Sequence, residues 1–249
     1  MKISLITVVY NNEKKIRETI ESVLSQKNID IEYIIIDGAS NDNTLNIINE
    51  YADRISLVIS EKDEGIYDAM NKGVNKATGD IIGILNSDDI FYDNYVLNNL
   101  CRVFINNPKV DIVYGNILYI DYNNTNKIIR NWISKDYTSN FFKNANVPPH
   151  PSTFVKKSVY EKAGNYNQKY HNASDYDFLF RILEIHKFKS KYINSYFVKM
   201  RVGGASNNSI KNIIRQNTAI INIWKDNGVS LPYYFFPIKL IKKLKQYFI

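Results

Sequence analysis

Two adjacent carboxylates, Asp88 and Asp89, follow an apolar run within GDIIGILNSDDIFYDN, residues 79–94. Because like charges repel, each carboxylate raises the cost of ionising the other. A bound divalent cation would remove that cost, and proteins often hold Mg²⁺ or Mn²⁺ with one or two carboxylates and the oxygens of a diphosphate. An Asp-Asp pair without further context, however, more often forms a solvated turn with an Asx hydrogen bond.

The first hundred residues alternate between strand and helix patterns. Near-continuous apolar, β-branched runs are typical of strands covered on both faces of a parallel sheet, and they lie at residues 3–9, 31–37, 54–60 and 80–86. Helical patterns lie between them at residues 16–24, 41–52 and 64–77, and Asn11 or Asn12 could cap the first helix. The alternation predicts an α/β fold with an open, mostly parallel central sheet and helices on both faces.

Acidic residues follow three of these predicted strands. Asp37 ends the second strand, Asp63 follows the third, and the Asp88/Asp89 pair follows the fourth. Ligands bind beyond the carboxyl ends of the strands in open parallel sheets, so this placement favours the cation site over the solvated turn. Neither G-x-G-x-x-G after the first strand nor G-x-x-x-x-G-K-[ST] is present. A phosphate ligand must therefore be held in another way.

The second half is less regular. Residues 110–122 predict one long or two short strands, and residues 123–146 are polar and loop-like. A short helix is expected at residues 158–164. A longer helix should follow, with a core face of Phe178, Leu179, Ile182, Leu183 and Ile185.

Composition and charge restrict the compartment and the partners. The single cysteine, Cys101, excludes an internal disulfide and favours a reducing compartment and a core position for its side chain. No apolar run approaches the length of about 18 residues that a spanning helix needs, so we expect a cytoplasmic protein, free or attached to a membrane surface. The net charge of +7 favours an anionic partner. Nucleic acid is not expected, because the basic residues are dispersed or gathered in an amphipathic tail.

Six segments carry a family resemblance: TVVYNN, IIIDGASNDNT, DEGIYDAMNKG, ATGDIIGILNSDD, HPSTFVKKSVYEKAGNYN and ASDYDFLFRIL. Together they closely resemble family 2 glycosyltransferases of the GT-A fold, especially the small bacterial members that build O-antigen, capsule or other surface polysaccharides. The resemblance implies a GT-A domain over residues 1–205, with a nucleotide-sugar-binding half (1–100) and an acceptor-binding half (101–205). Residues 206–249 would form a C-terminal helical extension.

The resemblance implies that a nucleotide-diphosphate sugar, usually uridine-based, lies across the first half of the sheet. Thr7, Val9 and Asn11 would lie near the nucleoside. Asp37 would accept a hydrogen bond from the base, and Asp63 would belong to the segment that closes over the nucleotide.

The same resemblance assigns the sugar and the metal. Asp68 and Asn71 match the helix beside the donor sugar, and Asp88 would face the ribose or the donor sugar. Asp89 is the implied ligand of Mn²⁺ or Mg²⁺. Asn86 stands where many relatives carry an acid, and it would serve as a neutral oxygen ligand or a sugar contact.

The acceptor side is implied by HNASDYDF, residues 171–178. Asp175 matches the last position of the family's Glu-Asp motif, which supplies the general base, while Ser174 stands where the glutamate often is. A helix cap at Ser174 or Asp175 is the structural alternative, and Asp177 is the second acid of the pair. His150 and His171 are acceptor-side candidates, with a purely structural role equally open for His150.

Two features near the C-terminus remain, of which only the first belongs to the resemblance. Arg201, Gly203 and Gly204 resemble a mobile loop that folds over the site, where the arginine would meet phosphate. The tail, residues 233–249, is aromatic, basic and amphipathic, with an apolar face of Ile238, Ile241, Leu244 and Phe248. It suits either an anionic membrane interface or packing on the domain or on a second subunit of a homodimer.

These features predict a metal-dependent inverting glycosyltransferase. It would move a hexose, such as glucose or galactose, from a UDP-sugar to a polyprenyl-diphosphate-linked oligosaccharide at the inner face of the cytoplasmic membrane. No Q-x-x-R-W motif is present, so we expect one sugar per encounter. The alternatives are a catalytically silent sugar-nucleotide or lipid-binding module and a sugar nucleotidylyltransferase, although TVVYNNEKK lacks the glycines of the latter's loop.

Overall fold

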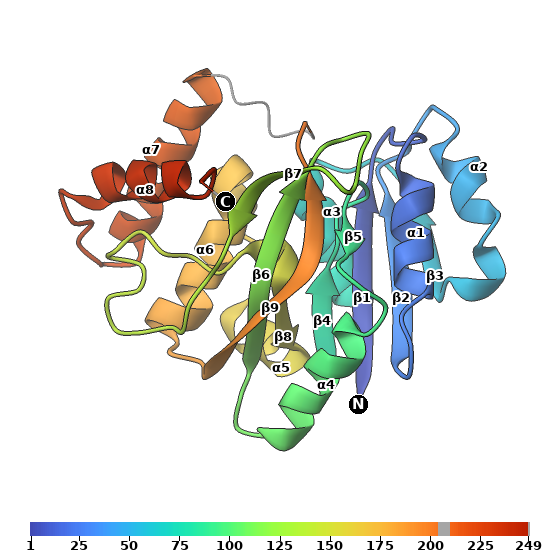
Figure 1. Ribbon diagram of the computed structural model, residues 1–249, viewed down its shortest axis with the longest axis horizontal. Coiled ribbons are helices and arrows are strands. Elements are labelled where there is room, and N and C mark those ends of the chain that lie inside the picture. Colours follow the sequence, from blue (N-terminus) through green and yellow to red (C-terminus); the bar gives the residue numbers. More distant parts are fainter. Residues whose placement is uncertain (204–209, 249) are drawn as a thin grey trace.

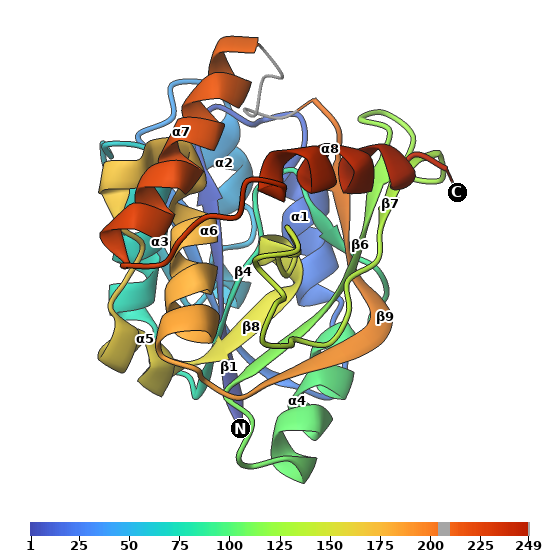
Figure 2. The same ribbon diagram turned by 90° about the vertical axis from the view of Figure 1, so that its left-hand side faces the viewer.

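The computed structural model describes residues 1–203 and 210–248. In these residues nine strands form one sheet, with helices against both of its faces (Figures 1 and 2). The strand order is β3-β2-β1-β4-β8-β6-β9-β5, and β7 also pairs with β6. The predicted α/β class is therefore confirmed.

The elements have the following bounds. The strands are β1 Lys2–Val9, β2 Asp30–Asp37, β3 Leu57–Ser60, β4 Ile81–Ile84, β5 Ile90–Phe91, β6 Ile112–Ile120, β7 Ile128–Trp132, β8 Thr153–Lys156 and β9 Ser190–Arg201. The helices are α1 Ile16–Leu24, α2 Thr44–Asn49, α3 Ile66–Lys76, α4 Val96–Asn106, α5 Lys157–Ala163, α6 Ser174–Phe180, α7 Ile210–Asp226 and α8 Phe235–Lys245. A π-helical turn, Arg181–Ile185, continues α6.

The first half forms the parallel sheet that the sequence predicts. β1 pairs in parallel with β2 on one side and with β4 on the other, and β3 adds to β2. Alternate side chains of β1 enter two hydrophobic cores: Ile6 and Val8 pack toward α3, whereas Ile3 and Leu5 pack toward α1, α2 and α4. Both faces of this strand are covered, which explains its near-continuous apolar sequence.

The second half extends the sheet with mixed pairings. β8 lies antiparallel between β4 and β6, and β9 pairs in parallel with β6. The contact between β4 and β8 is close, because a Cβ at Gly83 would lie 2.3 Å from the Phe154 ring. This glycine lets the antiparallel strands join the parallel half.

The local predictions had mixed outcomes. Residues 123–146, predicted to be loop-like, contain β7. Residues 110–122 contain the single strand β6, which is one of the two predicted alternatives. Neither Asn11 nor Asn12 caps α1 with its side chain; instead the Asn12 carbonyl accepts hydrogen bonds from the N–H groups of Lys15 and Ile16. Ile185 is 39% exposed, since it sits in the π-helical turn that ends α6 and is rotated off the core face. Cys101 is buried, as predicted.

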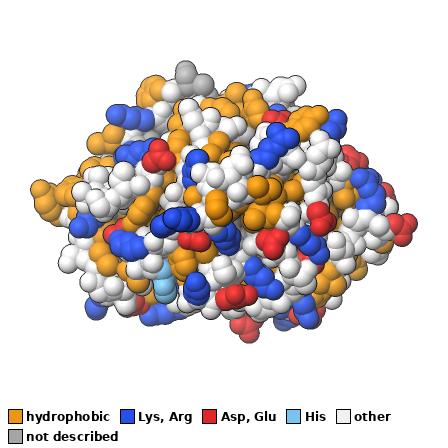
Figure 3. Space-filling model, turned by 90° about the horizontal axis from the view of Figure 1, so that it is seen from below, with side chains coloured by type: hydrophobic (Ala, Val, Ile, Leu, Met, Phe, Trp, Pro, Cys, Tyr) orange, Lys and Arg blue, Asp and Glu red, His pale blue; other side chains and the backbone are white. Residues whose placement is uncertain are grey.

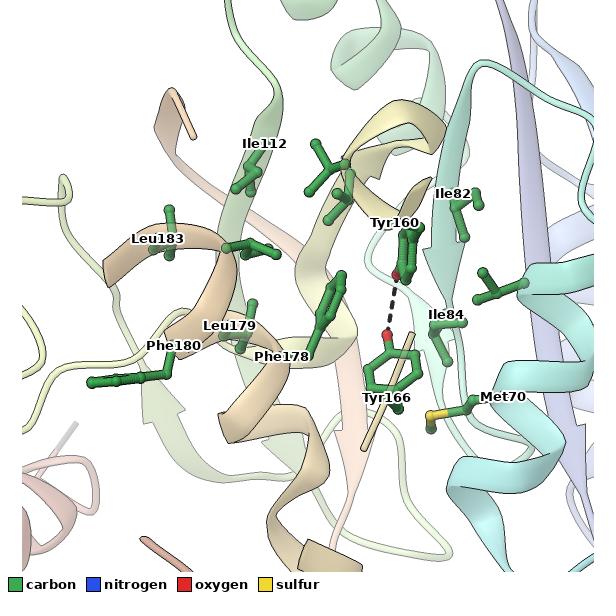
Figure 4. Close-up of a cluster of buried hydrophobic side chains, with 14 of the residues drawn as sticks. Met70, Ile82, Ile84, Ile112, Tyr160, Tyr166, Phe178, Leu179, Phe180 and Leu183 are labelled. Atoms are coloured by element: carbon green, nitrogen blue, oxygen red, sulfur yellow. Dashed lines mark hydrogen bonds between the residues drawn. The ribbon is translucent and has the colours of Figure 1, made fainter. Parts of the chain in front are cut away.

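The C-terminal helices share the core of the sheet. Trp224 of α7 and Phe235 of α8 are each 1% exposed and lie in the cluster that contains α3 and α6 side chains, part of which appears in Figure 4. The Trp224 ring packs 4.9 Å from that of Phe180, and its Nε1 donates to the Tyr176 hydroxyl at 2.8 Å. Helices α7 and α8 therefore contribute side chains to the core on this face of the sheet.

The surface carries charges of both signs at the end of the molecule that lies opposite the carboxyl ends of β1 and β2. Acidic and basic side chains are interspersed over this end (Figure 3). In the part of the chain that the structure describes, no helix combines the length and the apolar character needed to cross a bilayer.

Candidate active site

Strands β1, β2, β3 and β4 end together at one edge of the sheet, at the top of Figure 1. β2 ends at the buried residue Asp37. Its Oδ1 accepts a hydrogen bond from Ser40 Oγ at 2.5 Å, and its Oδ2 accepts from the Ser40 N–H at 3.1 Å and from Ser60 Oγ at 2.6 Å. Asp37 therefore fixes the loop that follows β2 against the end of β3.

Tyr10, Gly38 and Asp63 form a small cradle at this edge. A Cβ at Gly38 would lie 2.5 Å from Asp63 Oδ2 and 3.5 Å from Tyr10 Cδ2, so only a glycine fits here without movement. Asp63 Oδ1 also accepts a hydrogen bond from the Gly65 N–H at 2.9 Å. The Tyr10 ring is 62% exposed. An exposed ring beside a carboxylate can stack on a planar base, and this tyrosine, directly after a predicted strand, was missing from the sequence prediction.

Asn11 joins the loops that follow β1 and β2. Its backbone is left-handed, with φ of 49°. Its N–H donates to Ser40 Oγ at 2.8 Å, while its Oδ1 accepts from the Asn41 N–H at 2.9 Å. Asn11 is exposed at the same edge.

Thr7 and Val9 lie deeper than Asn11. Both side chains are buried, and Thr7 Oγ1 accepts a hydrogen bond from the Tyr33 hydroxyl at 3.2 Å. Burial raises the pKa of this tyrosine well above its usual range. Thr7 and Val9 can therefore pack beneath the loops at this edge of the sheet, but their side chains are not exposed there.

The Asp88/Asp89 pair lies beyond β4 as predicted. Asp89 is fully buried, and its Oδ1 and Oδ2 accept hydrogen bonds from the Arg201 N–H and Asn86 Nδ2, both at 3.2 Å. Burial, and then the charge of Asp88, raises the pKa of the Asp89 carboxyl. Burial also raises the pKa of Asp88, against the opposing charge of Arg201.

The oxygen atoms of this pair and of Asn86 fit a hard cation. Asn86 Oδ1 is buried without a hydrogen-bond partner among the described residues, beside two carboxylates whose ionisation is costly. Carboxylate and amide oxygens are the ligands that Mg²⁺ and Mn²⁺ prefer. Residues 1–203 and 210–248 contain no group of three or more His, Cys, Asp or Glu side chains arranged for a metal, so a cation here would need further oxygens from elsewhere.

Arg201 is the last residue of β9 and is 2% exposed. It is therefore not the loop arginine that the resemblance implies, and Gly204 of that loop lies outside the described residues. The Arg201 guanidinium donates to the Asp88 carbonyl and forms an ion pair with Glu18 of α1. Arg201 thus ties β9 and α1 to the turn that carries the acidic pair.

The first turns of α3 hold the two halves together. Asn71 pairs twice with the backbone of Tyr166: its Nδ2 donates to the carbonyl and its Oδ1 accepts from the N–H, both at 2.9 Å. Asp68 accepts from Gln168 Nε2 at 3.2 Å. Although burial alone would raise the pKa of Asp68, hydrogen bonds from the Glu64 N–H and Lys72 lower it. Asp68 and Asn71 therefore both contact the second half.

Asp175 lies in the first turn of α6. Its Oδ1 accepts a hydrogen bond from the hydroxyl of Tyr67, on α3, at 3.0 Å. Neither Ser174 nor Asp175 caps the helix with its side chain, because Ser174 Oγ donates to the Asn167 carbonyl. The capping alternative is therefore wrong.

His150 joins the same region through a chain of hydroxyls. Its Nε2 lies 2.8 Å from the Tyr166 hydroxyl, which lies 3.2 Å from that of Tyr160 (Figure 4). Burial lowers the pKa of His150, whereas the charge of Asp175 opposes that shift. A neutral His150 can accept or donate a hydrogen bond beside Asp175.

The remaining acceptor-side residues differ in position. His171 is exposed, with a left-handed φ of 40°. Asp177 is 1% exposed and forms an ion pair with Arg181 Nε at 2.8 Å. Arg181 also donates to the carbonyls of Ala163 and Asn165. Asp177 therefore holds the loop before α6 and is not at the surface of the site.

Arg130 of β7 is a further cation that the sequence did not single out. It is 9% exposed, and its guanidinium carbon lies 3.5 Å from the centre of the Tyr119 ring and 5.7 Å from that of Tyr247. Burial raises the pKa of Tyr119 to about 12, and Arg130 and Asp89 both interact electrostatically with this tyrosine. Because Arg130 lies in a stretch that was predicted to be a loop, its burial was not expected from the sequence.

Comparison with known proteins identifies relatives of this chain. The model of glycosyl transferase family 2 matches residues 4–180. A PGL/p-HBAD biosynthesis glycosyltransferase of Mycobacterium bovis is 28% identical over 210 residues, which cover 83% of this chain and 79% of the relative.

Two solved structures have a similar fold. S. aureus TarS 1-349 in complex with UDP-GlcNAc matches with a TM-score of 0.66 and 15% identity, over 89% of this chain and 67% of the other. The mannosyltransferase PcManGT from Pyrobaculum calidifontis, in complex with GDP-Man and Mn²⁺, matches with a TM-score of 0.66 and 16% identity, over 97% and 68%. At these identities the likeness shows the GT-A fold.

Proposed function

This chain belongs to glycosyltransferase family 2, and we propose that it is an inverting, metal-dependent hexosyltransferase. Its donor would be a UDP-sugar, and its acceptor a sugar hydroxyl of a polyprenyl-diphosphate-linked oligosaccharide. The hydrogen bond from Tyr67 to Asp175 carries the proposal. It supports a base on α6 that is held by the helix which follows the Asp63 cradle.

The donor nucleotide would lie on the Tyr10, Gly38 and Asp63 cradle. Stacking of the base on the exposed Tyr10 ring suits the amphipathic character of this side chain. Of the three donors on the Asp37 carboxylate only Ser40 Oγ bonds to Oδ1, so this oxygen keeps one lone pair for a base N–H. UDP-GlcNAc in TarS and GDP-Man in PcManGT support a nucleotide sugar as the donor class.

The metal would bind at Asp89, with Asp88 and Asn86 beside it. Mn²⁺ in the complex of PcManGT supports this part of the proposal. When bound, the cation would stabilise the negative charge that grows on the departing diphosphate. The buried Arg201 holds the turn that presents these oxygens, because it bonds to the Asp88 carbonyl and to Glu18.

The acceptor hydroxyl would lose its proton to Asp175. The Tyr67 hydroxyl occupies Asp175 Oδ1, so Oδ2 is the oxygen that would accept this proton while the acceptor oxygen attacks the anomeric carbon. Attack on the face opposite the nucleotide breaks the bond from this carbon to the diphosphate and inverts its configuration. A single positioned base of this kind contributes about 10²–10⁴-fold in rate.

The outer face of α8 supports attachment to the inner surface of the cytoplasmic membrane. Leu240, Ile241 and Leu244 are 59%, 53% and 53% exposed, and Phe248 is 83% exposed. Lys243 and Lys245 are exposed on the same helix. Apolar side chains next to lysines favour the interface of an anionic membrane. A second copy of this chain is the other partner that could cover these residues.

The Asp175→Asn variant tests the reaction. Transfer should fall by at least 10²-fold, while UDP binding in the presence of Mn²⁺ should be unchanged. Binding is measured by thermal unfolding with UDP, GDP and CDP, each with Mn²⁺ or a chelator. A nucleotide at a hundred times its Kd stabilises the protein by about 2.7 kcal/mol. Wild-type turnover by the variant would refute the base assignment, and no stabilisation by any nucleotide would favour a silent binding module.

A further inference from the structure

Helix α8 turns lysines toward the protein and apolar side chains away from it. Lys239 and Lys242 are partly buried, whereas Leu240, Ile241 and Leu244 are each more than half exposed. Water would favour the opposite orientation, because charge is costly to bury and apolar surface is costly to expose. The inward position of the two lysines therefore needs its own explanation.

Both lysines contact neutral oxygens. Lys239 Nζ donates to Asn217 Oδ1 of α7 at 2.9 Å. Lys242 Nζ donates to the Asn144 carbonyl at 2.7 Å and to Asn146 Oδ1. Within residues 1–203 and 210–248, neither lysine forms an ion pair with a carboxylate. Each ammonium group has three donors, so both can take a further acceptor.

The charges around these lysines are mostly positive. Lys243 interacts electrostatically with Lys239, and Lys135 and Lys245 interact with Lys242. Burial, and then these neighbours, lowers the pKa of Lys239 and that of Lys242 to about 8. Asp175, the base of the proposed reaction, also interacts electrostatically with Lys239 and opposes this shift. An anion bound between Lys239 and Lys242 would reduce the repulsion among these lysines.

We propose that Lys239 and Lys242 bind the diphosphate of a lipid-linked acceptor and so position its first sugars at Asp175. This inference rests on the proposed function and names the group by which the enzyme recognises its acceptor. An ammonium group is a compact point charge that suits phosphate oxygens. With the outer face of α8 in the interface, the inner lysines lie at the depth of the lipid headgroups, where the diphosphate of such a lipid must also lie.

The test measures recognition of the diphosphate separately from catalysis. The protein, saturated with UDP and Mn²⁺ to fill the donor site, is floated with neutral phosphatidylcholine vesicles. These contain either a polyprenyl diphosphate or phosphatidylglycerol at equal total charge. The wild type should prefer the diphosphate vesicles by at least tenfold, and the Lys239→Gln/Lys242→Gln variant should lose this preference.

Two further variants control for charge and folding. Lys243→Gln/Lys245→Gln removes two exposed charges of the same helix, so it should weaken binding to both vesicle types and keep the preference. Lys239→Arg/Lys242→Arg keeps the charge and should retain most of the preference for diphosphate vesicles. This variant therefore separates a loss of recognition from unfolding. An unchanged preference in the Lys239→Gln/Lys242→Gln variant, or an equal loss on both vesicle types, would overturn the inference.

Failure of this inference is distinguishable from failure of the proposed function. Transfer to a neutral alkyl glycoside of the acceptor sugar should require Asp175 and not the two lysines. If the lysine variant loses transfer to both the glycoside and the lipid-linked acceptor, the lysines do not act through the diphosphate. If the Asp175→Asn variant keeps its turnover, the proposed reaction fails whatever the vesicles show.

Discussion

Replacement of Glu32 by Gln should destabilise the parallel half of the sheet in a pH-dependent way. Glu32 lies on β2, at the end of the sheet away from the candidate site, and is 9% exposed. It accepts hydrogen bonds from Ser4 Oγ at 2.5 Å, from the Thr78 N–H at 2.7 Å and from Thr78 Oγ1 at 2.5 Å, and it pairs with Lys2 at 3.2 Å. The carboxylate thus joins β1, β2 and the turn before β4.

The pKa of Glu32 gives the size of the effect. Although burial alone would raise it, the hydrogen bonds from Ser4, Thr78 and Lys2 lower it from 4.5 to about 2. At about 1.36 kcal/mol per pKa unit this corresponds to about 3.4 kcal/mol at neutral pH, which solvent screening reduces to about 2 kcal/mol. Because the folded pKa is the lower one, this stabilisation is complete above pH 4.5 and is lost as the pH falls toward 2.

Urea unfolding at pH 7 and pH 3 measures this contribution. The free energy of unfolding of Glu32→Gln should be about 2 kcal/mol below that of the wild type at pH 7, and the difference should shrink to about 1 kcal/mol at pH 3. Glu161→Gln, at an exposed position of α5, is the matched control and should change little at either pH. An equal difference at both pH values would show that the charge of Glu32 does not stabilise the fold.

Two further predictions concern the site. Tyr67→Phe removes the hydrogen bond to Asp175. Because a hydrogen bond to a charged group contributes about 1.5 kcal/mol, kcat should fall by about 10-fold, while the Kd for UDP should be unchanged. Equal losses in kcat and in UDP affinity would contradict a role of Tyr67 in orienting the base. Ile241→Gln/Leu244→Gln removes exposed apolar side chains of α8, so binding to anionic vesicles should fall by about tenfold or more without loss of thermal stability. Unchanged cosedimentation would refute the membrane role of this face, and a shift from dimer to monomer would assign it to a second copy of the chain.

The sequence predicted the parallel half well because its strands are covered on both faces. Burial on both sides forces an unbroken apolar run, as in β1 and β2. β7 lacks this signal: Ile128 is 44% exposed, and the strand is recognisable mainly by its pairing with β6. The polar run of residues 123–146 therefore predicted a loop where a strand forms.

The position of the acidic groups was also predictable, whereas their partners were not. Asp37, Asp88 and Asp89 lie at the carboxyl ends of parallel strands, a place that topology alone determines. Arg201 bonds to the Asp88 carbonyl and to Glu18, which is 183 residues away in the sequence. Such a contact depends on how β9 and α1 pack, and no local pattern reports it.

Helix α3 shows why residue roles are harder to predict than their neighbourhood. The resemblance assigned Asp68 and Asn71 to the donor sugar, yet both contact the second half: Asp68 accepts from Gln168, and Asn71 pairs with the backbone of Tyr166. Tyr67, on the same turn, donates to Asp175. α3 begins directly after the loop that carries Asp63, whose Oδ1 accepts a hydrogen bond from the Gly65 N–H. The two halves of the candidate site are therefore joined through α3.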